Sequence, residues 1–344
     1  MTGSREAAGA GRRAAAALGG LAALCAVAAA PVAAPRAQEP SPEAVVDAFE
    51  RVTGTHPGFR RSDAKGVCAE GEWASTGAGA RLSAAAHLQP GARATAVARF
   101  SNGGGNPRAP DNAQAVRGLS LSLALPDGDT HEFVLINTPV FGARNVESLM
   151  RLLESRVPVP ATGQPDPQRV AAANAANPDW MPQITYLRET PPPASYATAP
   201  YFGVNSFVFV DAAGERRHAR WTFEPVAGRV GLSPEERQAR GPDYLQAELR
   251  ERVARAPAEW RVLLQLPRPG DPLHDATAAW PADRETVEVA RLRSTAVAPA
   301  GQPGACDPMM FNPLLLPRGI EPSDDPILHA RPAPYAVSLS RRLQ

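Results

Sequence analysis

The chain has 344 residues, with 36 basic and 35 acidic side chains and a net charge of +1. This balance excludes the basic surface expected of a nucleic-acid-binding protein. The 28 glycines and 37 prolines lie below the share typical of low-complexity chains. What remains is a globular chain that is long enough to bury a substantial core.

Residues 1–37 have the layout of a signal peptide. Arg5, Arg12 and Arg13 form a positively charged start, and an uncharged stretch rich in alanine follows over residues 14–30. The stretch is too short and too weakly apolar to favour a stable membrane span, although an uncleaved anchor is the alternative. The adjacent pair Arg12-Arg13 also fits a twin-arginine signal. We therefore expect export to the periplasm or the exterior of a bacterial cell, with no stable membrane insertion after cleavage.

Residues 38–344 favour a single α+β domain. In chain order the patterns predict a helix from 42, strands at 67–73, 95–101, 119–125 and 132–136, a helix after 145, a surface excursion over 156–200 with a short helix at 167–176, strands at 205–210 and 218–223, helices after 233 and over 244–255, and strands at 260–266 and 285–292. Ser41, Asn145 and Ser233 are residues that cap helices. Hairpins from two regions with helices inserted between them indicate an antiparallel barrel with helices packed around it.

Two cysteines, Cys68 and Cys306, remain once the leader is removed. An even count in an exported chain permits one disulfide, and two buried thiols are the alternative. The chain has no glycine-rich phosphate loop and no G-x-S-x-G elbow, and its cysteines lack zinc spacing. General motifs therefore give little information on function.

More specific motifs occur in one order along the chain. They are RRSDAKG at 60–66, RFS at 99–101, RG at 117–118, NTPVF at 137–141, FNP at 311–313 with GIE at 319–321, and RPAPY at 331–335. Together they resemble the catalase superfamily, in particular its short, exported catalase-related peroxidases. The resemblance implies a catalase-type antiparallel β-barrel of about eight strands with inserted and flanking helices. It also implies a minimal haem-binding core over 38–344, without the C-terminal extra domain of larger catalases.

The resemblance implies haem b as the cofactor and Tyr335 as the axial ligand of its iron. A phenolate ligand favours ferric iron over ferrous iron. Tyrosine is protonated in neutral water, so the anion needs a stabilising partner. Arg331 lies one helical turn earlier and can donate a hydrogen bond to the phenolate oxygen. Arg60, Arg99 and Arg342 resemble arginines that pair with haem propionates, and Phe141 resembles a phenylalanine of the haem pocket.

On the opposite side of the haem, the family uses a histidine with a supporting serine and an asparagine. Ser101 and Asn137 match the last two positions, but Asp63 stands where the histidine belongs. Three interpretations remain open. The carboxylate of Asp63 replaces the imidazole, with burial raising its affinity for a proton; His56 moves in from upstream; or the site is inactive. Asp63, Asn137 and Ser101 are thus the candidate catalytic residues.

Two further residues differ from the family pattern on the Asp63 side of the haem. Ser62 replaces an apolar residue, and Gly142 follows Phe141 where larger catalases have a second phenylalanine, so both changes are expected to open the pocket. We therefore expect a haem peroxidase that uses hydrogen peroxide or organic hydroperoxides to oxidise a small organic reductant. Catalase activity is expected to be weak or absent, and the protein to be a monomer or dimer. A non-catalytic haem-binding protein is the alternative, and an apolar-ligand barrel without haem is a third.

Overall fold

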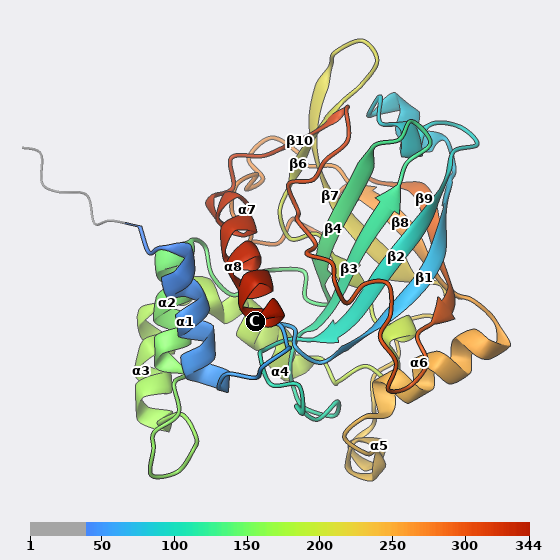
Figure 1. The fold of residues 1–344 in the computed structure, drawn as a ribbon. Helices are drawn as coiled ribbons and strands as arrows, with labels where there is room; N and C mark the ends of the chain where they lie inside the picture. The colour runs from blue at the N-terminus through green and yellow to red at the C-terminus, as the bar shows by residue number, and fades with distance from the viewer. Residues whose placement is uncertain (1–38) are drawn as a thin grey trace, which may run out of the picture. The chain divides into compact units, whose positions relative to one another are not determined.

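A closed antiparallel β-barrel forms the centre of residues 39–344, the part of the chain that the computed structural model describes (Figure 1). Eight strands pair in the order β1-β2-β3-β4-β5-β7-β8-β9, and β9 pairs with β1 to close the barrel. The predicted α+β class and the barrel of about eight strands are confirmed. The predicted signal peptide lies outside the described residues.

The strands of the barrel are β1 (Gly66–Ser75), β2 (Arg93–Asn102), β3 (Arg117–Ala124), β4 (Thr130–Ile136), β5 (Tyr201–Phe202), β7 (Arg216–Pro225), β8 (Ala258–Gln265) and β9 (Thr286–Val297). Two further strands, β6 (Phe207–Val210) and β10 (Ile320–Pro322), extend the sheet beside β7. Every pairing is antiparallel, which fits the hairpins expected from the turn residues. The two-residue β5 and the three-residue β10 were not expected, because strands this short show no periodicity.

Alternation along the strands separates the two faces of the barrel wall. The leucines at 119, 121 and 123 are fully buried, and Trp73, Phe100, Trp221 and Trp260 join the same core. Neighbours one residue away in the strand point to the opposite face. Arg99, Ser101 and Ser120 therefore lie on the outer face of β2 and β3.

A histidine pair is buried in the barrel core. His87 Nε2 lies 3.2 Å from Nδ1 of His131, and His131 packs against the ring of Phe133. Burial lowers the pKa of His87 to about 3, and burial followed by the proximity of His87 lowers the pKa of His131. Both rings are neutral in the folded chain at neutral pH.

Six helices lie on one side of the barrel, with α7 and α8 between the barrel and the group of α1, α2 and α3 (Figure 1). They are α1 (Pro42–Thr53), α2 (Val146–Ser155), α3 (Pro167–Ala176), α4 (Met181–Glu189), α7 (Pro326–Ala330) and α8 (Pro332–Leu343). At another edge of the barrel lie α5 (Pro234–Ala239) and α6 (Tyr244–Arg255). No helix among residues 39–344 is long and apolar enough to span a bilayer.

The predicted caps position the helices. Ser41 Oγ accepts a hydrogen bond from the amide of Ala44, and Asn145 Oδ1 accepts one from the amide of Ser148. Ser233 and Glu236 form the expected capping box of α5. The expectation of a surface excursion over 156–200 is wrong in part. α4 follows α3, and Trp180 between them is fully buried, with its indole N–H satisfied by Ser148 Oγ at 2.8 Å.

A disulfide joins the barrel to the segment that follows β9. Cys68 on β1 and Cys306 are bonded, with their Cα atoms 5.3 Å apart. The disulfide that the cysteine count permitted is thus present, and the alternative of two buried thiols is excluded. Both cysteines pack with Phe311 in a small apolar cluster on the outside of the barrel.

Candidate active site

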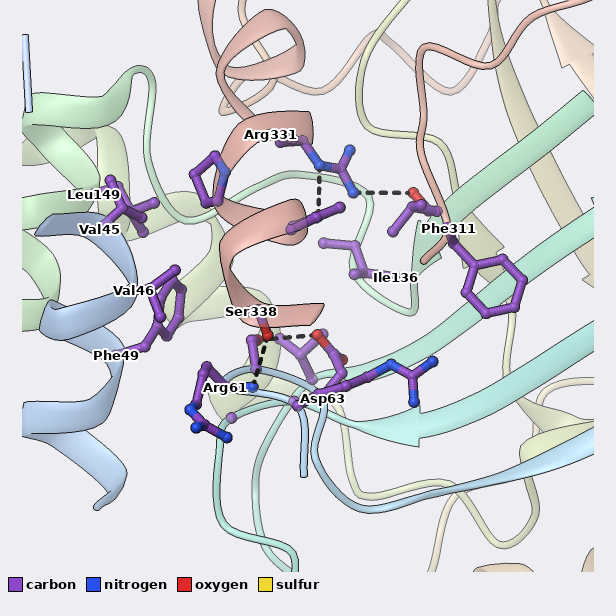
Figure 2. A pocket seen from close by; sticks show the side chains of 18 of the residues that line it. Val45, Val46, Phe49, Arg61, Asp63, Ile136, Leu149, Phe311, Arg331 and Ser338 are labelled. Carbon is purple, nitrogen blue, oxygen red and sulfur yellow. Dashed lines mark hydrogen bonds between the residues drawn. The ribbon is translucent and has the colours of Figure 1, made fainter. Parts of the chain in front are cut away.

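A cavity of about 380 Å³ lies between the outer face of β3 and β4 and the helices α1, α2, α7 and α8. Apolar side chains form much of its wall (Figure 2): Val45, Val46 and Phe49 come from α1, Leu149 comes from α2, and Ile136 and Phe311 lie on the barrel side. Of the predicted site residues, six line the cavity: Arg60, Asp63, Phe141, Arg331, Tyr335 and Arg342.

Tyr335 lies in the first turns of α8 and is held by a chain of hydrogen bonds. Arg331 Nε donates to the Tyr335 hydroxyl oxygen at 2.9 Å, and its Nη1 donates to Asn205 Oδ1 at 3.0 Å. Asn205 Nδ2 in turn donates to Asp325 Oδ2 at 2.8 Å. The other oxygen of Asp325 caps α7 by accepting the amide of Ile327. The guanidinium of Arg331 is therefore fixed against the tyrosine oxygen, as the spacing of the two residues predicted.

Asn205 and Asp325 were not predicted as site residues. Both are buried, and burial raises the pKa of Asp325 despite the hydrogen bond from Asn205. The Asp-Pro pair at 325–326 is a helix-start signal that could have located the cap. Nothing local marks Asn205, since it approaches Arg331 only through the fold.

Asp63 sits on the other side of the cavity in a left-handed backbone conformation, with φ of +54°. It is the one non-glycine residue with positive φ among residues 39–344. Aspartate and histidine are both enriched in this region, so either residue suits the backbone at this position. Aspartate can therefore stand here without a change of main-chain path.

Two hydroxyl groups hold the carboxylate of Asp63. Ser101 Oγ donates to Oδ1 at 3.1 Å, and Ser62 Oγ donates to Oδ2 at 3.0 Å. Gly118 makes room for this arrangement, since a Cβ there would lie 2.5 Å from Ser101 Oγ and 3.2 Å from Asp63 Oδ1. Ser101 thus supports the residue at the histidine position, as the resemblance implied.

The remaining candidates on this side lie away from the cavity wall. Asn137 is 8% exposed, and its side-chain oxygen accepts a hydrogen bond from the amide of Arg117 at 2.7 Å. His56 Nε2 donates to the carbonyl of Thr53 at 3.0 Å, and His56 does not line the cavity. The interpretation in which His56 replaces the missing imidazole is therefore wrong for this structure.

The expected opening at Gly142 is also wrong. A Cβ at this position would lie 2.5 Å from Oε1 of Gln183, so the glutamine of α4 fills the space. Gln183 Nε2 donates to Thr138 Oγ1 and to the carbonyl of Val140, both at 3.0 Å, which fixes the side chain at the cavity wall. Gln183 was not predicted as a site residue because α4 itself was not predicted.

Arg60 and Arg342 approach one short turn from two sides. Arg60 Nη2 donates to the carbonyls of Cys306 at 3.1 Å and Met309 at 2.8 Å. Arg342 Nη2 donates to the same Met309 carbonyl at 3.2 Å. These acceptors are neutral, so neither arginine finds a counter-charge there.

Arg99 completes a cluster of three positive charges. Its Nη2 donates to the carbonyl of Ala64 at 3.1 Å, and Gly66 leaves space for the guanidinium, which would lie 2.6 Å from a Cβ. Burial, followed by the charges of Arg99 and Arg342, lowers the pKa of Arg60, and burial is also the main cause that lowers the pKa of the other two. Within residues 39–344, no carboxylate lies within ion-pair distance of the cluster.

Two nitrogens of this cluster are buried without any hydrogen-bond partner in the described part of the chain. They are Arg99 Nε and Arg342 Nη1. A buried charge is costly unless it is paired and hydrogen-bonded. The cluster is therefore suited to bind a ligand that carries carboxylates or other anionic groups.

The barrel and its flanking helices define a fold class. They superpose on a solved structure described as "Structure of a bacterial catalase" with a TM-score of 0.74 and 23% sequence identity, over 83% of this chain and 57% of that chain. The family model described as Catalase matches residues 50–344. The chain therefore belongs to the catalase family.

Two relatives of similar length are named catalase-related peroxidase. The protein from Synechococcus elongatus is 39% identical over 88% of this chain and 88% of its own length. The protein from Mycolicibacterium paratuberculosis is 33% identical over 88% of this chain and 95% of its own length. The catalase of Listeria monocytogenes is 27% identical, and the match spans 60% of that longer protein.

Proposed function

We propose that this protein is a haem-dependent peroxidase. It reduces hydrogen peroxide or an organic hydroperoxide and oxidises a small organic reductant, with weak or no catalase activity. The observation that carries the proposal is one cavity that holds an arginine-bonded tyrosine, Tyr335, and a hydroxyl-bonded carboxylate, Asp63. The names of the two catalase-related peroxidases support the same class of activity.

The residues present fit a haem group. Haem carries two propionates, and Arg60, Arg99 and Arg342 form a cluster in which Arg99 Nε and Arg342 Nη1 have no partner. Its flat apolar ring suits walls made of apolar side chains, such as those from α1 and α2. Tyr335 supplies the oxygen that would bind the iron. We infer haem b, because the cysteines of the mature chain are engaged in the disulfide and are not free to attach a haem covalently.

The Tyr335 side of the cavity would set the charge of the iron ligand. Haem, when bound, supplies the iron at which the peroxide is reduced. Arg331 Nε donates to the oxygen of Tyr335 at 2.9 Å and would stabilise its phenolate form. Asn205 and Asp325 hold that guanidinium in place. An anionic oxygen ligand stabilises ferric iron.

The Asp63 side of the cavity would transfer a proton during cleavage of the peroxide. Cleavage of a peroxide needs a group that takes the proton from one oxygen and returns it to the other. Each carboxylate oxygen of Asp63 accepts one hydroxyl hydrogen bond and has a further lone pair to offer a peroxide proton. Ser62 and Ser101 would keep the carboxylate oriented during the transfer.

The same carboxylate explains the expected weakness of dismutation. Dismutation requires a second peroxide to be oxidised, and the group at position 63 must also handle its protons. Carboxylates are ordinarily weaker bases than imidazole near neutral pH, so they assist this second reaction less. An organic reductant that delivers its electrons one at a time does not depend on that base to the same extent.

The cellular setting is part of the proposal. A disulfide persists in an oxidising compartment such as the periplasm or the exterior. This supports the exported location expected from residues 1–37, and the protein is expected to act there as a monomer or dimer.

The experiment follows the absorption spectrum of the purified mature chain. Titration with ferric haem should give a Soret band at a stoichiometry of one, and hydrogen peroxide should change that band until a phenolic reductant restores it. A band that ignores peroxide would favour a non-catalytic haem-binding protein. The absence of any band would overturn the proposal and leave an apolar-ligand barrel.

A further inference from the structure

We propose that the Cys68–Cys306 disulfide is a positioning element for the anion-binding arginines Arg60 and Arg342. By fixing the turn that carries their acceptors, it sets how firmly the carboxylates of the ligand are held. The inference rests on the proposed function, because it takes the propionates of haem as those carboxylates.

The turn begins at the bonded cysteine itself. The amide of Met309 donates to the carbonyl of Cys306 at 3.2 Å, which closes a four-residue turn. The same Cys306 carbonyl and the Met309 carbonyl then accept from Arg60, and the Met309 carbonyl also accepts from Arg342. The disulfide and all three arginine hydrogen bonds therefore meet within residues 306–309.

The turn belongs to a long connection that is also held by a hydrogen bond from the amide of Asn312 to Glu132 Oε2 of β4. Residues 298–319 connect β9 to β10 without a helix or strand of their own. A connection of this length is uncommon inside a compact domain unless it is functional or tied down. Cys68 lies near the start of β1, where it pairs with Arg99 of β2, and thus ties the turn to the barrel sheet.

The packing around the disulfide is tight as well. A Cβ on Gly304 would lie 2.4 Å from Cβ and 2.8 Å from Sγ of Cys68, so this glycine lets the backbone approach the bridge. Phe311 packs with both cysteines in one apolar cluster and also lines the cavity. A displacement of the turn would therefore move both the arginine acceptors and part of the cavity wall.

Both side-chain hydrogen bonds of Arg60 end on this turn. Its guanidinium forms no ion pair within residues 39–344, and Asp307, the carboxylate that acts on it most strongly, belongs to the same turn, so the position of the turn decides where the positive charge lies. Without the bridge, the carbonyls gain conformational freedom and the arginine cluster becomes less ordered. Part of the binding free energy of the ligand would then be spent on ordering the arginine cluster, so the ligand would bind more weakly.

The test compares haem release from the native chain and from Cys68→Ala/Cys306→Ala, by transfer of haem to excess apomyoglobin. We expect release to be about tenfold faster in the variant, the scale typical for loss of an outer-shell partner. Amide exchange of Met309 in the haem-free chain should also be faster. The matched control is Val289→Ala, a buried residue of β9 in the barrel core, which lowers stability without touching the turn.

A second ligand separates positioning from general stability. Haem dimethyl ester has uncharged ester groups in place of the propionates, so its release should change less than twofold between the native chain and the cysteine variant. In an Arg60→Ala background, removal of the cysteines should accelerate haem release by much less than tenfold, because coupled residues are not additive.

The outcomes are distinct. Equal haem release from the native chain and the cysteine variant overturns the inference. Equal acceleration for haem and for its dimethyl ester also overturns it, because the bridge would then act on the fold as a whole. If the native chain takes up no haem, the proposed function itself fails.

Discussion

The Tyr335 side and the Asp63 side of the cavity are built differently. On the Tyr335 side, a charged guanidinium joins the phenol to Asn205 and a buried carboxylate at Asp325. On the Asp63 side, two neutral hydroxyls hold the carboxylate in a left-handed backbone position. The first side keeps the residues that the family resemblance implied, and the second exchanges its acid–base group. Binding of haem and cleavage of peroxide should therefore be separable by substitution.

The largest effect should come from Tyr335→Phe. Loss of the ligand oxygen should weaken haem binding by more than about 100-fold, beyond the 10- to 100-fold typical of outer-shell partners. Titration of the haem-free chain, followed at the Soret band, measures it. An unchanged affinity and spectrum would contradict the assignment of the ligand.

Asn205→Ala should destabilise the Tyr335 side of the cavity. It removes the partner of Arg331 Nη1 and of the buried carboxylate of Asp325, each of which stays desolvated. The expected cost is about 1–3 kcal/mol in the free energy of unfolding, measured with urea on the haem-free chain. The outcome that speaks against this account is an unchanged unfolding midpoint.

Arg342→Gln should act in opposite directions on the haem-free and haem-bound forms. Removing one of three clustered charges relieves repulsion in the haem-free chain, so stability should stay equal or rise. Haem affinity should fall by about tenfold, since a charge-assisted bond is lost. The neighbouring Arg341→Gln is the control, because Arg341 pairs with Asp47 and Glu50 instead. It should lower stability by about 1 kcal/mol or less and leave haem affinity unchanged.

The buried histidine pair should make the folded chain less stable in acid. His87 has a folded pKa of about 3 against 6.5 in the unfolded chain, so the unfolded chain binds more protons below pH 6.5. Stability is therefore full above pH 6.5 and falls as the pH drops toward 3, by up to about 1.4 kcal/mol per pH unit for each histidine.

His87→Gln should flatten this acid limb while leaving the rate of peroxide reduction at neutral pH unchanged. Urea unfolding at several pH values between 4 and 7 measures the slope. A slope identical to that of the native chain would show that the loss of stability arises elsewhere.

Much of the fold could be predicted from local patterns. The alternating leucines of β3 and the caps at Ser41, Asn145 and Ser233 gave the correct elements, because a period of two or a capping side chain acts over a few residues. α4 was missed since its proline, alanine and asparagine-rich surroundings resemble a loop. Its contribution to the cavity, Gln183, was missed with it.

The candidate site was predicted less completely. Residues within motifs, such as Arg331 and Tyr335, were located because four residues along a helix bring two side chains together. Asn205 contacts Arg331 from a loop far away in sequence, and the apolar face of α1 lines the cavity only once the whole domain has folded. Contacts of this kind depend on the tertiary fold and leave no local signal.

The central claim is that Asp63 moves the proton during peroxide cleavage. The most direct measurement is the stopped-flow rate at which the haem-loaded chain reacts with hydrogen peroxide, for the native protein, Asp63→Asn and Asp63→His. We expect Asp63→Asn to react with peroxide about 100-fold more slowly, which is the lower range for general acid–base catalysis. We expect Asp63→His to release more oxygen from peroxide than the native protein. A native rate in Asp63→Asn, with haem content unchanged, would contradict the claim.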